Sequence, residues 1–78
     1  MVKITIEETA KLLGCRPDLI RQDLQRTAPR FTFGVGFPPE GDRGRWYYFI
    51  QPGKLADWLG ITLTDLEAEV LHLREADG

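Results

Sequence analysis

Three residues near the middle of the first half of the chain, Arg21, Gln22 and Gln25, have side chains that can read the edges of DNA bases. Arginine can donate two hydrogen bonds to guanine, and glutamine can form a donor and acceptor pair with adenine. In a helix these residues share one polar side, together with Asp18 and Arg26. A solvated helix face has the same composition, so base contact and simple solvation both remain open from these residues alone.

Further cations around this segment could contact phosphate oxygens. Arg16 precedes the segment, where it either binds a phosphate or stays in solvent. Arg43 and Arg45 flank Gly44 in a turn-rich stretch, where arginines suit phosphate or minor-groove contact, or instead discourage strand pairing between molecules. We favour DNA contact for this pair. The remaining candidate phosphate contacts are Arg26, Arg30 and Lys54.

Residues for catalysis or for a cofactor are missing from the sequence. The one cysteine and the one histidine, Cys15 and His72, lie too far apart to predict a zinc site. No nucleophile has a neighbouring base, and no glycine-rich phosphate loop is present. We therefore expect no enzyme activity, no catalytic residue, no metal and no cofactor.

Composition places the chain among small globular domains. It has 78 residues, of which 42% are hydrophobic and 28% charged. No apolar run approaches the roughly 20 residues of a membrane span, and the start MVKITIEE lacks an apolar signal region. A single cysteine cannot form an internal disulfide, which fits a reducing compartment. We expect a cytoplasmic protein that does not interact with a membrane.

The net charge of −2 is unevenly distributed along the chain. Residues 1–54 contain nine Lys/Arg against six Asp/Glu, a net charge of +3. Residues 55–78 contain one arginine against six acids, a net charge of −5. A basic first part can bind phosphates locally because salt screens distant charges beyond about 8 Å. The acidic end predicts weaker non-specific DNA affinity than a uniformly basic domain would have.

Two short helices joined by a tight turn should position the candidate side chains. Thr5 and Glu8 have the spacing of a capping box, which predicts a helix start near Ile6. Gly14 should end this helix, and Pro17 suits the first turn of the next one. We expect the second helix to extend towards Thr27. Its buried stripe should consist of Leu19, Ile20 and Leu24.

A hairpin should follow, because the apolar period changes to two. Alternating residues over 31–37 and the aromatic run over 46–50 predict two strands, with a Gly/Pro/Asp turn over 38–44. Alternation predicts that Trp46 and Tyr48 share a face and that only one of Tyr47 and Tyr48 points inward. The eight aromatic residues could form a base-stacking platform, but core packing is the preferred interpretation.

Two more helices should complete the chain. Pro52 and Gly60 bound a segment with Leu55, Trp58 and Leu59 on its apolar face. A cap at Thr62 or Thr64 should open the last helix. This helix has an apolar stripe that either packs on the domain, which we favour, or forms a homodimer. The stripe consists of Leu63, Leu66, Val70 and Leu73.

This order of elements resembles the small winged helix-turn-helix proteins of the excisionase and MerR-like group. The matching segments are TIEETAKLLGCRPDLIRQDLQR, then RFTFGVGF and GRWYYFI, then QPGKLADWLG. The resemblance implies an α+β fold, mainly α, with two N-terminal helices, a β-hairpin wing and two C-terminal helices. Residues 1–60 would form the winged domain and residues 61–78 an acidic helix. Arg16 departs from the group, which usually has Ser or Thr there, and Asp18 and Asp23 add negative charge on or near the second helix.

The resemblance also implies a function, namely sequence-specific binding of double-stranded DNA. The second helix would enter the major groove and the hairpin would contact the backbone. The protein would act as an excision factor or transcription regulator of bacterial or phage type, with a recombinase or RNA polymerase as a further partner. Recognition-helix contacts would come from Arg16, Asp18, Arg21, Gln22, Gln25 and Arg26, and wing contacts from Arg30, Arg43, Arg45 and Lys54. The alternative is a protein-interaction module that uses its acidic last helix and does not bind DNA.

Overall fold

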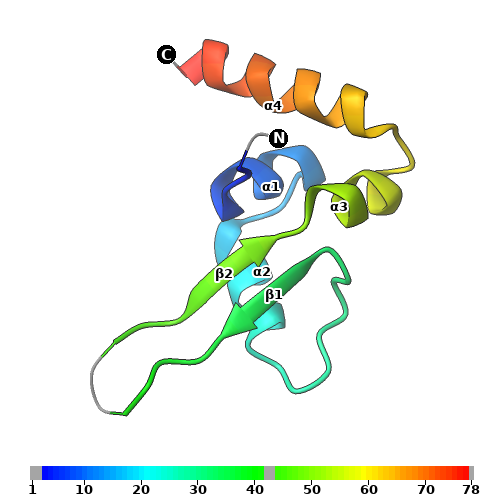
Figure 1. Ribbon diagram of the computed structural model, residues 1–78. Helices are drawn as coiled ribbons and strands as arrows, with labels where there is room; N and C mark the ends of the chain where they lie inside the picture. The colour runs from blue at the N-terminus through cyan, green and yellow to red at the C-terminus, as the bar shows by residue number, and fades with distance from the viewer. Residues whose placement is uncertain (1–2, 42–43, 78) are drawn as a thin grey trace.

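A computed structural model describes residues 3–41 and 44–77 of the chain. The elements follow the order α1 (Ile6–Leu13), α2 (Pro17–Leu24), β1 (Gly34–Phe37), β2 (Tyr47–Ile50), α3 (Pro52–Leu59) and α4 (Leu63–Asp77). Figure 1 shows the hairpin in front of α2, with α4 beyond α1 on the far side of the molecule from the strands. The predicted α+β class, mainly helical, is confirmed, and the arrangement is compatible with a winged helix.

The start of α1 and the turn from α1 to α2 both form as the capping residues predict. Thr5 Oγ1 accepts a hydrogen bond from Glu8 N at 3.1 Å, and Glu8 Oε1 accepts one from Thr5 N at 3.0 Å. Gly14 ends α1 in the left-handed region with φ of 72°, a conformation that glycine adopts without steric cost. Pro17 then begins α2, where its missing N–H leaves no helical hydrogen bond unmade.

The buried side of α2 is narrower than expected. Ile20 and Leu24 are buried in the core, whereas Leu19 is 51% exposed, so the prediction for Leu19 is wrong. Successive helical residues are separated by about 100°, which turns Leu19 away from the direction shared by Ile20 and Leu24. The helix also ends at Leu24, before the predicted end near Thr27.

The hairpin is shorter than the alternation predicts, because β1 begins at Gly34 and not at Phe31. Its strands are antiparallel, with Gly34 opposite Ile50, and the register continues to Phe37 opposite Tyr47. Beyond the hairpin, Gln51 N donates a hydrogen bond of 2.7 Å to Phe33 O, which joins the residue before β1 to the start of α3.

The inner face of the hairpin packs closely against α2. A Cβ added at Gly36 would lie 2.4 Å from the carbonyl oxygen of Leu24, so a larger residue does not fit without a backbone shift. Ile50 and Tyr48 lie on the same inner face, because they pair with Gly34 and Gly36. Tyr48 stacks on Trp46 with ring centroids 6.5 Å apart, which confirms their predicted shared face.

The aromatic residues divide between the core and the surface. Phe33 is fully buried, and Phe31 stacks on it with ring centroids 5.0 Å apart. Trp58 meets both rings edge-on at 5.5 Å, although 45% of it remains exposed. In contrast, Phe37 and Phe49 are exposed, so the expectation that the aromatics pack in the core is wrong for these two. Tyr47 is exposed and Tyr48 is half-buried, which confirms that only one of the two tyrosines points inward.

The last helix folds back on the domain, which is the interpretation that the sequence favoured. Thr62 Oγ1 accepts a hydrogen bond from Asp65 N at 3.1 Å, so Thr62 is the cap rather than Thr64. Leu66 and Val70 are fully buried where α4 packs on α1 and α3. Since the middle of the stripe is already covered, the stripe cannot serve intact as a homodimer surface. Its other members are Leu73, which is half-buried, and Leu63, which is 41% exposed.

An ion pair fixes α4 to α1. Arg74 Nε lies 2.6 Å from Glu8 Oε2, and Arg74 also donates a hydrogen bond of 2.6 Å to Lys3 O. The hydrogen bond that Arg74 donates to the Glu8 carboxylate lowers the pKa of Glu8 from its ordinary 4.5 to about 2, because it stabilises the ionised form. Glu8 therefore joins two helices while it also caps the first.

Candidate nucleic-acid interface

The open side of α2 is polar and centred on Gln22. Because Ile20 and Leu24 face the core, Gln22 lies on the opposite side of the helix. Gln22 is exposed, as are Asp18 and Gln25 beside it. Arg16 is exposed at the N-cap position, next to the first turn. The sequence-based expectation of an outward polar face therefore agrees with the exposure of these residues.

Arg21 is less available than its position in the sequence suggests. Its Nη2 lies 2.5 Å from Glu7 Oε1 on α1, and its Nη1 lies 3.0 Å from Asp18 Oδ1. Its side chain is 34% exposed. Both ends of the guanidinium already bind carboxylates, so contact with guanine would require breaking an ion pair.

Asp23, which was expected to add negative charge on or near the second helix, is a structural residue. Its side chain is 9% exposed and its carboxylate accepts hydrogen bonds from Arg30 N at 3.2 Å and Phe31 N at 2.9 Å. These bonds turn the chain from α2 towards β1. A carboxylate in the last turn of a helix interacts unfavourably with the helix dipole. This unfavourable position is the sequence signal that could have indicated a structural role for Asp23.

A hollow brings several of the predicted residues together on one side of α2. Its volume is about 380 Å³. The cations Arg26 and Arg30 line it with Gln22. Arg26 is 53% exposed. Its ion pair with Asp23 is long, with Nη1 3.9 Å from Oδ1, so its guanidinium remains accessible. The exposed Leu19 also lines the hollow, which provides an apolar contact beside the polar groups.

The hairpin is tied to the end of α2. Gln25 Nε2 donates a hydrogen bond of 2.6 Å to the hydroxyl of Tyr48 on the inner face of the hairpin. Together with the close approach of Gly36 to Leu24, this bond holds hairpin and helix in one arrangement. Gln25 is therefore a positioning residue in this structure, although the sequence predicted it as a base contact.

The other predicted wing residues lie apart from this hollow. Arg45 is exposed and lines a separate hollow with Phe37 and Tyr47. Lys54, on α3, lines a third hollow with Thr32, Asp57 and Trp58. Arg43 lies outside the residues that the structure describes. The structure thus brings together Gln22, Arg26 and Arg30 but does not bring Lys54 to them.

The acidic helix does not cover the open side of α2. In Figure 1, α1 lies between α4 and α2, and α4 packs on α1 and α3. Its carboxylates are therefore separated from the candidate interface, and salt limits their effect at that distance.

Other kinds of site receive no support from the described residues. Within residues 3–41 and 44–77, no three His, Cys, Asp or Glu residues are grouped to hold a metal ion. In the same ranges, every helix is too short or too polar to cross a membrane. Comparison with family models, curated proteins and solved structures gives no match. The functional argument therefore rests on the geometry of the chain itself.

Proposed function

We propose that this protein binds double-stranded DNA in a sequence-specific manner, as a small winged helix-turn-helix protein. The observation that carries the proposal is the hollow where Gln22, Arg26 and Arg30 meet on the open side of α2. An amide flanked by two cations provides one group for a base edge and two for phosphates.

In the proposed complex α2 lies in the major groove. Gln22 contacts a base edge, because it is exposed on the side of the helix opposite the buried Ile20 and Leu24. Arg16, at the other end of the helix, is exposed and suited to a backbone phosphate. Arg45 on the hairpin would contact the adjacent backbone, since the hairpin is fixed to α2 by the Gln25–Tyr48 hydrogen bond.

The biological role in this proposal is that of an excision factor or a transcription regulator. A protein of this size acts by occupying or bending DNA so that a recombinase or RNA polymerase assembles correctly. The role requires no catalytic group, and the proposal includes none.

Selection of bound duplexes from a random library, followed by titration in increasing salt, tests this proposal. We expect a recurring short sequence, and an affinity that falls steeply as salt increases, because phosphate contacts release counterions. Absence of duplex binding even at low salt would reject the proposal.

A second candidate function is a protein-interaction module that uses the acidic α4. It is favoured by the outward side of this helix, where Leu63 and Leu71 are 41% and 48% exposed. Glu67 and Glu75 precede and follow Leu71 by four residues and so share its side of the helix, and Glu75 is also exposed. A basic amphipathic partner segment would match this surface. Retention of such a partner by a chain that binds no duplex would favour this function.

A further inference from the structure

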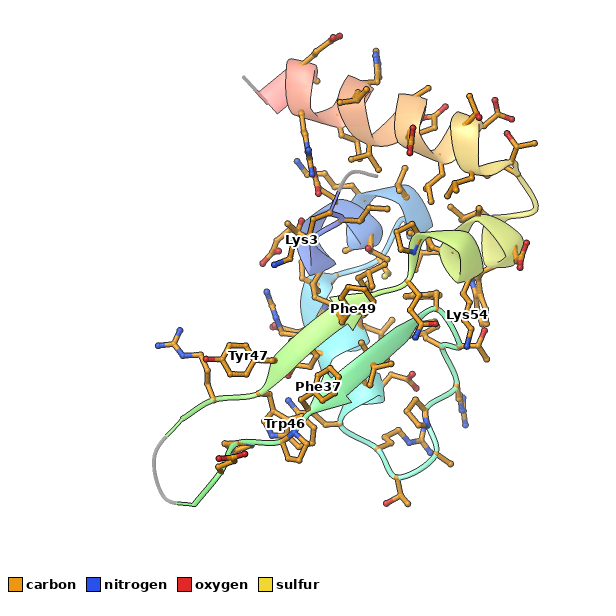
Figure 2. All side chains as sticks on the ribbon, viewed as in Figure 1. Lys3, Phe37, Trp46, Tyr47, Phe49 and Lys54 are labelled. Carbon is orange, nitrogen blue, oxygen red and sulfur yellow. The ribbon has the colours of Figure 1, made fainter. Side chains whose placement is uncertain are left out.

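The outer face of the hairpin is the aromatic surface that the proposed function does not use. Phe37, Tyr47 and Phe49 are 51%, 68% and 48% exposed there. They alternate with the inward-facing residues of β1 and β2, so they point away from α2. Figure 2 shows Phe37 and Phe49 over the strands of the hairpin and Tyr47 projecting from the left edge of β2.

These rings differ from the other aromatic residues of the chain. Five aromatic side chains each meet another ring: Phe31, Phe33, Trp46, Tyr48 and Trp58. Within the described part of the chain, Phe37, Tyr47 and Phe49 stack on no ring. These three side chains therefore have no aromatic neighbour on them and are about half exposed or more.

Strand geometry sets the spacing of this outer aromatic face. Phe37 is directly opposite Tyr47, and such cross-strand neighbours lie about 5 Å apart. Phe49 is two residues beyond Tyr47 on the same strand, a step of roughly 7 Å. Flat groups separated by such steps can each rest on a different ring.

Three described cations lie near the outer aromatic face, namely Lys3, Arg45 and Lys54, and Asp57 shares the hollow of Lys54. In the view of Figure 2, Lys3 and Lys54 lie on either side of Phe49. Arg45 lines a hollow of about 290 Å³ with Phe37 and Tyr47, in which Glu40 is the acid present. None of these three cations forms an ion pair with a residue in the described ranges. The charge of this rim favours an anionic ligand.

The extent of the face argues against a second copy of the chain as its occupant. Three half-exposed rings offer on the order of 300 Å², whereas a stable interface buries about 800 Å² on each partner. A two-fold contact would also bring the cationic rim of one copy near that of the other. Unpaired nucleotides fit both the small aromatic area and the cationic surroundings, since each nucleotide has a flat base and a negative phosphate.

We propose that the outer aromatic face of the hairpin binds a short segment of single-stranded nucleic acid. Two or three bases stack on Phe37, Tyr47 and Phe49, while Lys3, Arg45 and Lys54 contact the phosphates. Duplex DNA cannot use this face in the same way, because its bases are stacked on one another. The three rings lie across the hairpin from α2, and the site shares Arg45 with the proposed duplex interface.

Titration of the full chain with a fluorescent thymidine 12-mer at low salt tests the site. We expect Tyr47→Ala and Phe49→Ala each to weaken binding about tenfold, because each removes one stacking ring. Tyr47→Phe should bind like the wild type. Leu71→Ala, on the far helix α4, is the matched control for loss of an exposed apolar side chain. Circular dichroism verifies that each variant is folded.

An abasic 12-mer with the same phosphates separates stacking from ionic attraction. We expect it to bind at least tenfold more weakly than the thymidine 12-mer. Equal affinity for both oligonucleotides, for polyglutamate, or for wild type and Ala variants would overturn the proposal. So would a dimer in sedimentation that Tyr47→Ala dissociates, since a second copy would then be the occupant. Duplex binding by the same variants is measured in parallel, so failure of this site and failure of the α2 interface give different results.

Discussion

Arg21 on α2 lies 2.5 Å from Glu7 on α1, and this ion pair joins the two helices across their turn. The contact has two consequences. It links α2 to α1 beside the turn, and it withholds a cation from the surface that would bind DNA in the proposed complex.

Replacing Glu7 with Gln should release Arg21 for phosphate or base contact. We expect a several-fold gain in duplex affinity, together with a loss of stability below about 1 kcal/mol, because exposed ion pairs contribute little. Gel-shift titration and urea unfolding measure the two effects. Glu75→Gln in α4 removes the same charge far from α2, and an equal gain in that variant would show that only net charge matters.

Substitutions of Gln22 and Arg30 should have different effects on specific and non-specific duplex binding. Gln22→Ala should weaken binding to a selected site by ~1–3 kcal/mol while leaving non-specific duplexes unaffected. Arg30→Ala should weaken both duplexes alike and reduce the slope of log affinity against log salt by about 1. Titration of both variants on both duplexes checks this. If Gln22→Ala weakened the two duplexes equally, Gln22 would not be a base contact.

The helical part of the fold was predictable because its boundaries are set by local chemistry. The Thr5 and Glu8 capping box, Gly14, Pro17 and Gly60 act through their own backbones and near neighbours. Such signals depend little on the rest of the chain, which is why all of them appear where the sequence placed them.

The site was less predictable because its details depend on distant partners. The pairing of Arg21 with Glu7 spans fourteen residues, and that of Gln25 with Tyr48 spans twenty-three. Hydrophobicity also gave a wrong prediction of core packing for Phe37 and Phe49. Alternation gives a strand two faces, but in a two-stranded sheet it does not tell whether another layer covers the second one.

The Glu8–Arg74 ion pair should make stability depend on pH. Because folding lowers the pKa of Glu8 from 4.5 to about 2, the ionised carboxylate stabilises the fold above pH 4.5, and this contribution disappears as the pH falls towards 2. Glu8→Gln keeps a capping-box residue but loses the charge.

We expect Glu8→Gln to lower the free energy of unfolding by about 1 kcal/mol at pH 7, a value reduced by solvent screening of the exposed partner Arg74. The difference from the wild type should shrink between pH 4.5 and pH 2. Urea unfolding at several pH values measures it. A difference independent of pH would mean that the charge of Glu8 does not contribute.

Asp23 should be among the most sensitive polar positions for folding. Asp23→Ala leaves the backbone N–H groups of Arg30 and Phe31 without their acceptor, which should cost about 1–3 kcal/mol. Asp18→Ala, at an exposed position on the same helix, should cost less than about 0.5 kcal/mol. Equal thermal midpoints for the two variants would contradict the assignment of Asp23 to the turn.

Gly36 and Gly53 provide a matched pair of Gly→Ala substitutions. A Cβ at Gly36 would meet the Leu24 carbonyl oxygen at 2.4 Å, whereas a Cβ at Gly53 would meet nothing within 4 Å. We expect Gly36→Ala to destabilise by ~1–3 kcal/mol and Gly53→Ala to stabilise by up to about 1 kcal/mol. Calorimetry distinguishes these outcomes, and a stabilising Gly36→Ala would show that the hairpin can move away from α2.

The tight contact of Gly36 with Leu24 also limits what a binding site can look like. The contact opposes sliding of the hairpin past the helix, so in the proposed complex the two stretches of duplex that they would touch must have a constant separation. Inserting a single base pair between those stretches would shift them by about 3.4 Å. A protein with a compliant wing would tolerate such an insertion, and this one should not.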